Sequence, residues 1–196
     1  MAVIGLTGGA GCGKSYVAEI ATQSFDMLHI NTDNIARRQM QPGGASFDAV
    51  VMNFGQEILA DDGSIDRSAL AQVVFNDSEK LALLNSITHP NVTQTVKALI
   101  EASREDFEHV LIETAILKEA GYEEMCDAIW YVRAPIEDRR RRLLERGYSQ
   151  ERIDDVLDSQ SSDEVFMSYA TAVIDNPDTA GQQDIEEQIR ENIKKI

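Results

Sequence analysis

Residues 8–15 spell G-x-x-x-x-G-K-S and directly follow the apolar run of residues 2–6. A short buried strand, a glycine-rich turn and a helix form the context in which this motif binds phosphate. Glycines can turn successive N–H groups inward, and the helix that follows adds the positive end of its dipole. A chance glycine-rich turn is the alternative, but residues 17–21 continue as an apolar helix face. The segment therefore predicts a nucleoside triphosphate site.

The residues of this loop have distinct expected roles. The Lys14 ammonium can reach the β- and γ-phosphates of ATP, and the Ser15 hydroxyl can bind Mg²⁺. Cys12 is either a small residue that the loop tolerates or a redox-sensitive thiol at a helix N-terminus. The expected ATP contacts in this segment are Gly8, Gly9, Ala10, Gly11, Cys12, Gly13, Lys14, Ser15 and Tyr16.

Length and charge narrow the class of protein. The 196 residues fit one α/β domain with insertions, and no apolar run approaches the ~20 residues that span a bilayer. The first apolar stretch follows no basic segment and runs straight into the phosphate loop, so cleavage there would remove the site. We therefore expect a cytoplasmic protein without membrane contact. The net charge of −16 would repel a phosphate backbone, which argues against a nucleic-acid partner.

Five short apolar runs, bounded by polar residues, indicate buried strands. Helical patterns separate the runs, which is typical of a parallel sheet covered on both faces. The runs are residues 2–6, 27–30, 110–112, 128–132 and 172–174. We expect an α/β fold in which a five-stranded parallel sheet and a terminal helix at 182–196 form the nucleotide-binding core. The residues assigned to this core are 1–33, 107–135 and 168–196.

Residues 34–106, between the second and third strands, have a mostly helical pattern. The helices expected there are 35–41, 47–54, 68–75, 78–86 and 92–103. His89-Pro90 separates the last two, because the residue before a proline is driven toward an extended backbone. A helical insertion between two core strands is a natural substrate-binding subdomain.

Several arginines lie within one short stretch of this acidic chain, which favours a small polyanionic ligand. They are Arg133, Arg139, Arg140, Arg141, Arg142 and Arg146. Two amphipathic helices joined at residues 146–149 suit a lid, residues 136–167, that closes over phosphates. If the guanidiniums are free, their repulsion keeps the segment mobile until ATP supplies negative charge. The alternative is a solvated helix face with intrahelical Arg–Glu pairs.

The phosphate loop alone leaves the reaction open, because kinases, GTPases and motor ATPases share it. The sequence contains no Asn-Lys-x-Asp segment of the kind that reads guanine, so a small-molecule kinase is favoured. Asp33 follows the second strand and is either a base for an attacking hydroxyl or, like Thr32, a cap for a helix that starts near Ile35. Glu113 ends the third strand and is either a Walker-B acid that orients Mg²⁺ or an ordinary polar strand end.

These motifs, in order, resemble the dephospho-CoA kinase family over nearly the whole chain. The phosphate loop is widely shared, whereas the segments around Asp33, His89 and Asn176 are far more specific. The matching segments are residues 5–15, 33–37, 42–43, 54–55, 62–63, 66–67, 87–90, 142–146 and 173–176, together with Leu70, Phe75 and Gln160.

The resemblance implies a nucleotide-kinase-like core, a helical CoA-binding subdomain and a lid. It implies transfer of the ATP γ-phosphate to the ribose 3′-hydroxyl of dephospho-CoA. Asp33 becomes the expected general base, with Lys14 and Arg142 as the other catalytic residues. Arg146 and Asn176 become ATP contacts, and Arg37, His89 and Glu113 become substrate-side residues.

The chain departs from the family pattern at two informative places. Glu113-Thr114-Ala115 stands where the family usually has Asp-x-Pro, which keeps the charge but loses the proline. The arginine run requires one extra residue before Arg142, so Arg141 is an alternative lid arginine. The competing functions are another P-loop nucleoside or nucleotide kinase and a non-catalytic ATP-binding regulatory module.

Overall fold

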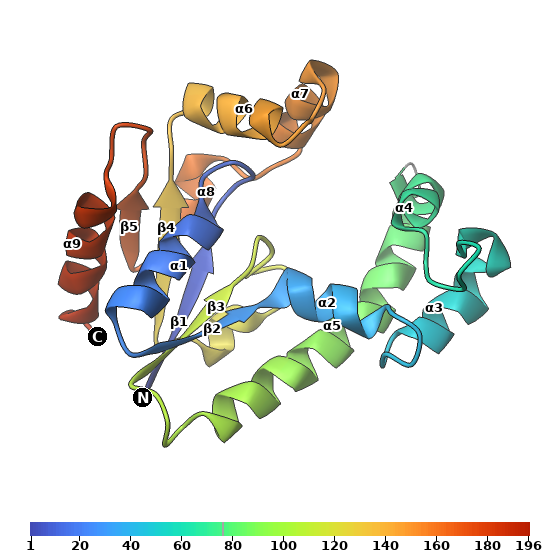
Figure 1. The fold of residues 1–196 in the computed structure, drawn as a ribbon, viewed down its shortest axis with the longest axis horizontal. Helices are drawn as coiled ribbons and strands as arrows, with labels where there is room; N and C mark the ends of the chain where they lie inside the picture. Colours follow the sequence, from blue (N-terminus) through green and yellow to red (C-terminus); the bar gives the residue numbers. More distant parts are fainter. Residues whose placement is uncertain (76) are drawn as a thin grey trace. The chain divides into compact units, whose positions relative to one another are not determined.

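The computed structural model describes residues 1–75 and 77–196, which divide into two compact units (Figure 1). The first unit contains residues 1–30 and 102–196, and the second contains residues 31–101. The division therefore falls slightly before the expected boundaries at 33 and 106, and residues 136–167 are part of the first unit. Among the described residues, no helix is both long and apolar enough to cross a bilayer.

The first unit is built on a five-stranded parallel sheet, which confirms the predicted fold class. The strands lie in the order β2-β3-β1-β4-β5, so β1 is central and pairs in parallel with both β3 and β4. Each predicted apolar run lies within one strand: β1 (Ala2–Thr7), β2 (Met27–Asn31), β3 (His109–Glu113), β4 (Ala128–Arg133) and β5 (Ala172–Asp175). The phosphate loop leaves the carboxyl end of the central strand, which is where ligands bind in open α/β sheets.

Both faces of the sheet are covered. Alternate residues of the strands, such as Ile4 and Trp130, pack against α1 (Lys14–Ser24) and α9 (Gln182–Ile193) in one apolar core. These two helices contact each other as well as the sheet (Figure 1). On the opposite face of β4, Tyr131 stacks on Phe166 of α8 (Asp163–Met167), with ring centroids 4.9 Å apart. Because successive side chains of a strand point to opposite faces of the sheet, a strand such as β4 contributes to a core on both faces.

The arginine-rich segment forms two helices, α6 (Ile136–Glu145) and α7 (Gln150–Asp158), as predicted. The break between them contains Gly147 at φ 84°, a left-handed conformation that favours glycine. Ser149 then begins α7 by accepting a hydrogen bond from the Arg152 N–H. A short 3₁₀ helix, η2 (Tyr122–Met125), and α8 were not predicted, because each spans too few residues to show a periodic pattern.

The second unit is helical and has its own apolar core. Its elements are α2 (Thr32–Gln39), α3 (Phe47–Phe54), the 3₁₀ helix η1 (Gln56–Ile58), α4 (Arg67–Phe75) and most of α5 (Ser78–Ala102). The core of this unit includes Val50, Phe54, Ile58, Ile65, Leu70 and Val74. The predicted helices 47–54 and 68–75 are confirmed, to within one residue at the start of the latter.

The prediction of two helices separated at His89-Pro90 was wrong. Pro90 lies inside α5, which runs without interruption from Ser78 to Ala102. Proline removes one backbone donor from a helix, but the turns on both sides are retained by packing: Thr88 and Val92 are buried. The Asn91 amide also donates to the Ile87 carbonyl oxygen at 3.1 Å, which adds a hydrogen bond beside the proline.

Candidate active site

The phosphate loop presents free backbone donors. Gly11 and Gly13 have φ values of 77° and 92°, which is the left-handed region that the cradle requires. Helix α1 has no side-chain cap and no acidic residue in its first turn. Within residues 1–75 and 77–196, no backbone hydrogen bond is donated by the N–H groups of Gly11, Gly13, Lys14 or Ser15. A helix start with unpaired N–H groups is an anion site.

The Lys14 side chain lies along the loop. Its Nζ donates to the carbonyl oxygens of Gly8 and Gly9, at 2.8 and 3.1 Å. These acceptors are uncharged, so a phosphate oxygen would be a stronger partner for the ammonium. The structure therefore places this cation at the loop, as the motif predicts.

A chain of polar contacts runs beneath the loop from Ser15. The Ser15 hydroxyl donates to Glu113 Oε1 at 2.6 Å, and Glu113 Oε2 lies 2.8 Å from His29 Nε2. The Glu113 side chain is 6 % exposed, so its two oxygens are held by these neighbours in a nearly dry setting. Glu113 ends β3, and its carboxylate contacts a phosphate-loop hydroxyl, as a residue that orients Mg²⁺ would.

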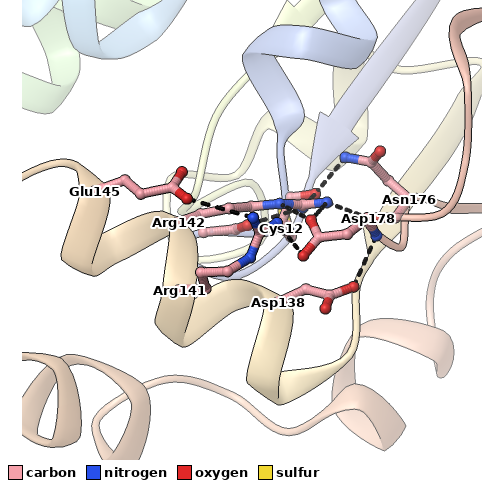
Figure 2. A network of polar contacts seen from close by, with 8 residues as sticks. Cys12, Asp138, Arg141, Arg142, Glu145, Asn176 and Asp178 are labelled. Carbon is pink, nitrogen blue, oxygen red and sulfur yellow. Dashed lines mark hydrogen bonds and ion pairs between the residues drawn. The ribbon is translucent and has the colours of Figure 1, made fainter.

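The outer side of the loop is held through its carbonyl oxygens. Arg139 Nε donates to the Ala10 oxygen at 2.9 Å, and Arg142 Nη1 donates to the oxygens of Gly11 and Cys12, both at 3.2 Å. The buried Asn176 adds a 2.8 Å bond from its amide to the Cys12 oxygen (Figure 2). We call Arg139, Arg142 and Asn176 the carbonyl clamp.

Asp178 fixes the arginine at the centre of this clamp. It accepts from Arg142 Nε at 3.0 Å and also pairs with Arg141, while its own N–H donates to Asp138 (Figure 2). Partial desolvation alone would raise the pKa of Asp178, but the hydrogen bonds from Arg141 and Arg142 lower it below the usual range. The carboxylate therefore stays charged at neutral pH.

The structure does not support free, mutually repelling arginines on α6. Arg140 pairs with Asp154 of α7, and Arg141 pairs with Glu145 and Asp178. The intrahelical Arg141–Glu145 pair agrees with the alternative of a solvated face, whereas Arg142 points to the phosphate loop with an 18 % exposed side chain. Arg146 is exposed just beyond α6. Arg140, Arg141 and Arg142 are thus compensated by acids, which lie from 4 to 37 residues away in the sequence.

Cys12 and Tyr16, two other predicted ATP contacts, differ in exposure. Cys12 is 1 % exposed and belongs to the apolar core beneath the loop, so its thiol is shielded from solvent. A redox-sensitive thiol must be accessible to an oxidant, and the buried Cys12 thiol does not meet this requirement. Tyr16 is 43 % exposed on the first turn of α1.

Three predicted residues lie in the second unit. Asp33 is exposed in the first turn of α2, and the cap of that helix is Asn31, whose side chain accepts from the Asn34 N–H at 2.9 Å. The alternative that Thr32 or Asp33 caps the helix was therefore wrong. Arg37 lies in the last turn of α2. His89 lies within α5, where burial lowers the pKa of its imidazole and so keeps it neutral at pH 7.

Comparison with known proteins decides the family. The family model described as dephospho-CoA kinase matches residues 2–182. The chain belongs to the dephospho-CoA kinase family. A Corynebacterium glutamicum dephospho-CoA kinase is 38% identical over the whole of this chain and 98% of its own length. A Moorella thermoacetica dephospho-CoA kinase is 40% identical over 89% of this chain and 83% of its own. A crystal structure of a Thermus thermophilus protein is 29% identical, with a TM-score of 0.83 over 99% of this chain and 96% of its own.

Sequence reasoning missed three residues of this dephospho-CoA kinase family site. Arg139 and Gln160 share a 2.7 Å hydrogen bond, and Gln160 Oε1 also accepts from the Ala10 N–H at 2.9 Å. His29 contacts Glu113 from the neighbouring strand. Gln160 stood among the matching motifs, but nothing in its spacing showed that it faces residue 10. A lone histidine on an apolar strand is an equally weak signal.

Arg142→Ala tests the structural role of the carbonyl clamp. We expect the free energy of unfolding to fall by about 2 kcal/mol, because three backbone oxygens lose a charged donor. The affinity for ATP should fall together with the stability. Arg141→Ala, which removes a 55 % exposed guanidinium, should change stability very little. Urea denaturation and ATP titration measure both variants, and equal effects would contradict the assignment.

Proposed function

We propose that this chain transfers the γ-phosphoryl group of ATP to the ribose 3′-hydroxyl of dephospho-CoA, giving coenzyme A and ADP. The observation that carries the proposal is the set of free N–H groups at the start of α1, within a chain that the family model matches from residue 2 to 182. Dephospho-CoA is the acceptor that the names of the relatives indicate. A net charge of −16 opposes nucleic acid as a partner, and the need for ATP favours the cytoplasm.

Phosphoryl transfer requires one bond to form and one to break. In the proposed reaction the 3′-oxygen of the acceptor bonds to the γ-phosphorus, and the bond from that phosphorus to the β,γ-bridging oxygen breaks. The hydroxyl proton goes to the Asp33 carboxylate. The Lys14 ammonium leaves the carbonyl oxygens of Gly8 and Gly9 for phosphate oxygens, where it offsets the developing negative charge.

The residues around Ser15 fit Mg²⁺ by the chemistry of their donors. The Ser15 hydroxyl and the Glu113 carboxylate are hard oxygen ligands, which Mg²⁺ prefers, and they lie in direct contact. Among the described residues there is no group of three or more acidic, histidine or cysteine side chains that could hold a metal by itself. Mg²⁺ in kinases normally completes its shell with water and nucleotide phosphates. Bound there, the ion would neutralise phosphate charge, while His29 keeps Glu113 oriented.

A direct assay tests the proposed function. Purified protein is incubated with Mg²⁺, ATP and dephospho-CoA, and ADP release is measured together with the phosphorylated product. We expect stoichiometric ADP and coenzyme A, and no product from a 3′-deoxy analogue of the acceptor. Nucleosides and nucleoside monophosphates serve as competing acceptors. Preferred transfer to one of them, or ATP binding without any transfer, would refute the proposal.

We also propose that residues 136–160 close over bound ATP. Because Arg140, Arg141 and Arg142 already have acidic partners, closure requires exchange of these partners for phosphate rather than relief of repulsion. Hydrogen exchange with and without a non-hydrolysable ATP analogue measures this. We expect slower exchange in α6 and α7 with the analogue. Unchanged exchange would show that these helices are a fixed wall of the site.

A further inference from the structure

The second unit contains a pocket of about 160 Å³ that the phosphate loop does not explain. Its lining comes from two places, the end of α2 and the segment that leads into α4. The lining residues are Arg37, Met40, Gln41, Ser64, Ile65 and Arg67. Ile65 belongs to the apolar core of the unit and Met40 packs against that core, so the lining combines two apolar side chains with two arginines.

Both sides of this pocket are held in place by hydrogen bonds. On the α2 side, Gln39 Nε2 donates to the Asn91 carbonyl oxygen at 3.0 Å and to Thr95 Oγ1 at 2.8 Å, which attaches α2 to α5. On the other side, Leu59 and Ile65 form an antiparallel bridge. The turn between them is closed by a hydrogen bond from the Ala60 N–H to the Ser64 oxygen at 2.8 Å, and Asp62 accepts from the Ser64 hydroxyl at 2.6 Å.

The two guanidiniums of the pocket have no acidic partner. Within residues 1–75 and 77–196, the side chains of Arg37 and Arg67 form no hydrogen bond and no ion pair. Acidic partners are plentiful in this chain, which has 34 acidic and 18 basic side chains. Arg140, Arg141 and Arg142 of α6 are paired with such acids. Two unpaired guanidiniums on one small pocket therefore indicate a place for an anion.

The position of Arg67 strengthens this argument. It is the first residue of α4, where the positive end of the helix dipole disfavours a cation. The first turn of α4 contains no acidic residue, and the preceding Asp66 accepts from the N–H groups of Ser68 and Ala69. The Asp66 carboxylate is thus engaged by the start of the helix, and a bound anion would give the Arg67 guanidinium a charged partner.

We infer that Arg37 and Arg67 bind the diphosphate of the acceptor substrate, an inference that rests on the proposed function. Dephospho-CoA carries a diphosphate between its adenosine and its pantetheine arm, with two negative charges. Two guanidiniums balance that charge, and each can donate hydrogen bonds to two phosphate oxygens at once. The apolar lining residues Met40 and Ile65 suit the uncharged groups next to the diphosphate. The phosphates of ATP have a separate site in the loop of the first unit.

Calorimetric titration of dephospho-CoA tests the inference in protein saturated with a non-hydrolysable ATP analogue, so that the phosphate loop is already filled. Arg67→Gln and Arg37→Gln should each weaken binding about 10-fold or more, because each removes a charge-assisted contact. Arg67→Lys should weaken binding less than Arg67→Gln, since lysine keeps the positive charge but cannot donate two parallel hydrogen bonds as a guanidinium does. The matched control is Arg38→Gln, an exposed arginine on the same turn of α2 that does not line the pocket.

A second ligand separates a charge contact from a structural role. An analogue of dephospho-CoA with an uncharged linker in place of the diphosphate should bind the wild type and both Gln variants equally. Equal losses for the charged and uncharged ligands, or losses in Arg38→Gln as large as in Arg67→Gln, would overturn the inference. If the wild type transfers phosphate to dephospho-CoA while the variants bind it normally, the inference fails and the proposed function stands. If the wild type shows no transfer, the proposed function fails.

Discussion

Lys14→Ala should lower turnover by about 100-fold or more, with little change in melting temperature. The ammonium contacts only the carbonyl oxygens of Gly8 and Gly9 among the described residues, so the fold loses little when it is removed. Phosphoryl transfer loses a charge that acts on the transferring group, where a single donor is worth on the order of 10²–10³ in rate. Single-turnover kinetics with dephospho-CoA measures the chemical step.

The control for this variant is Lys97→Ala, which removes an exposed lysine of α5. It should retain wild-type turnover and wild-type ATP affinity. Near-normal turnover in a folded Lys14→Ala protein would mean that the loop binds phosphate without contributing to transfer, and the kinase assignment of this loop would then be wrong.

Asp33→Asn should also lower turnover by about 100-fold or more, because an amide cannot accept the hydroxyl proton. The structure sharpens this test. Asn31, rather than Asp33, caps α2, so the substitution leaves the cap intact and removes only a first-turn charge. That charge is worth about 0.3–1 kcal/mol at an exposed position. The melting temperature should therefore fall slightly while activity falls steeply.

Asp48→Asn is the matched control, since Asp48 is an exposed carboxylate in the first turn of α3. It should reproduce the small stability change of Asp33→Asn and leave turnover unchanged. The readout is single-turnover kinetics, first for the Asp48→Asn control and then for Asp33→Asn. Activity that survives in this variant would leave positioning, rather than proton transfer, as the contribution of the second unit.

Local sequence patterns predicted the sheet and most helices, because the side chains that each element buries follow from the periodicity of that element alone. A strand such as β4 is apolar on both faces, since Trp130 and Tyr131 are each nearly fully buried in different cores. Pro90 shows where the local rule fails. The rule describes an isolated helix, whereas buried residues on both sides keep α5 continuous. Such packing is invisible until the rest of the unit is in place.

The candidate site also has a part that local sequence patterns predict and a part that they do not. The phosphate loop could be predicted because its donors belong to consecutive residues. The carbonyl clamp could not, because Arg142 and Asn176 reach Cys12 across separations of 130 and 164 residues. Arginine spacing on α6 suggested phosphate contacts, yet the partners of Arg142 in the structure are backbone oxygens and the Asp178 carboxylate. Long-range polar pairs depend on topology, and a spacing pattern does not contain that information.

The carbonyl clamp has a consequence for affinity. The oxygens of Ala10, Gly11 and Cys12 are turned outward and held by Arg139, Arg142 and Asn176, so these peptide planes are fixed before a nucleotide arrives. A flexible loop would lose conformational entropy on binding, whereas here most of that loss belongs to folding. The phosphate cradle is thus preorganised, and the binding energy of ATP remains available for the transfer step.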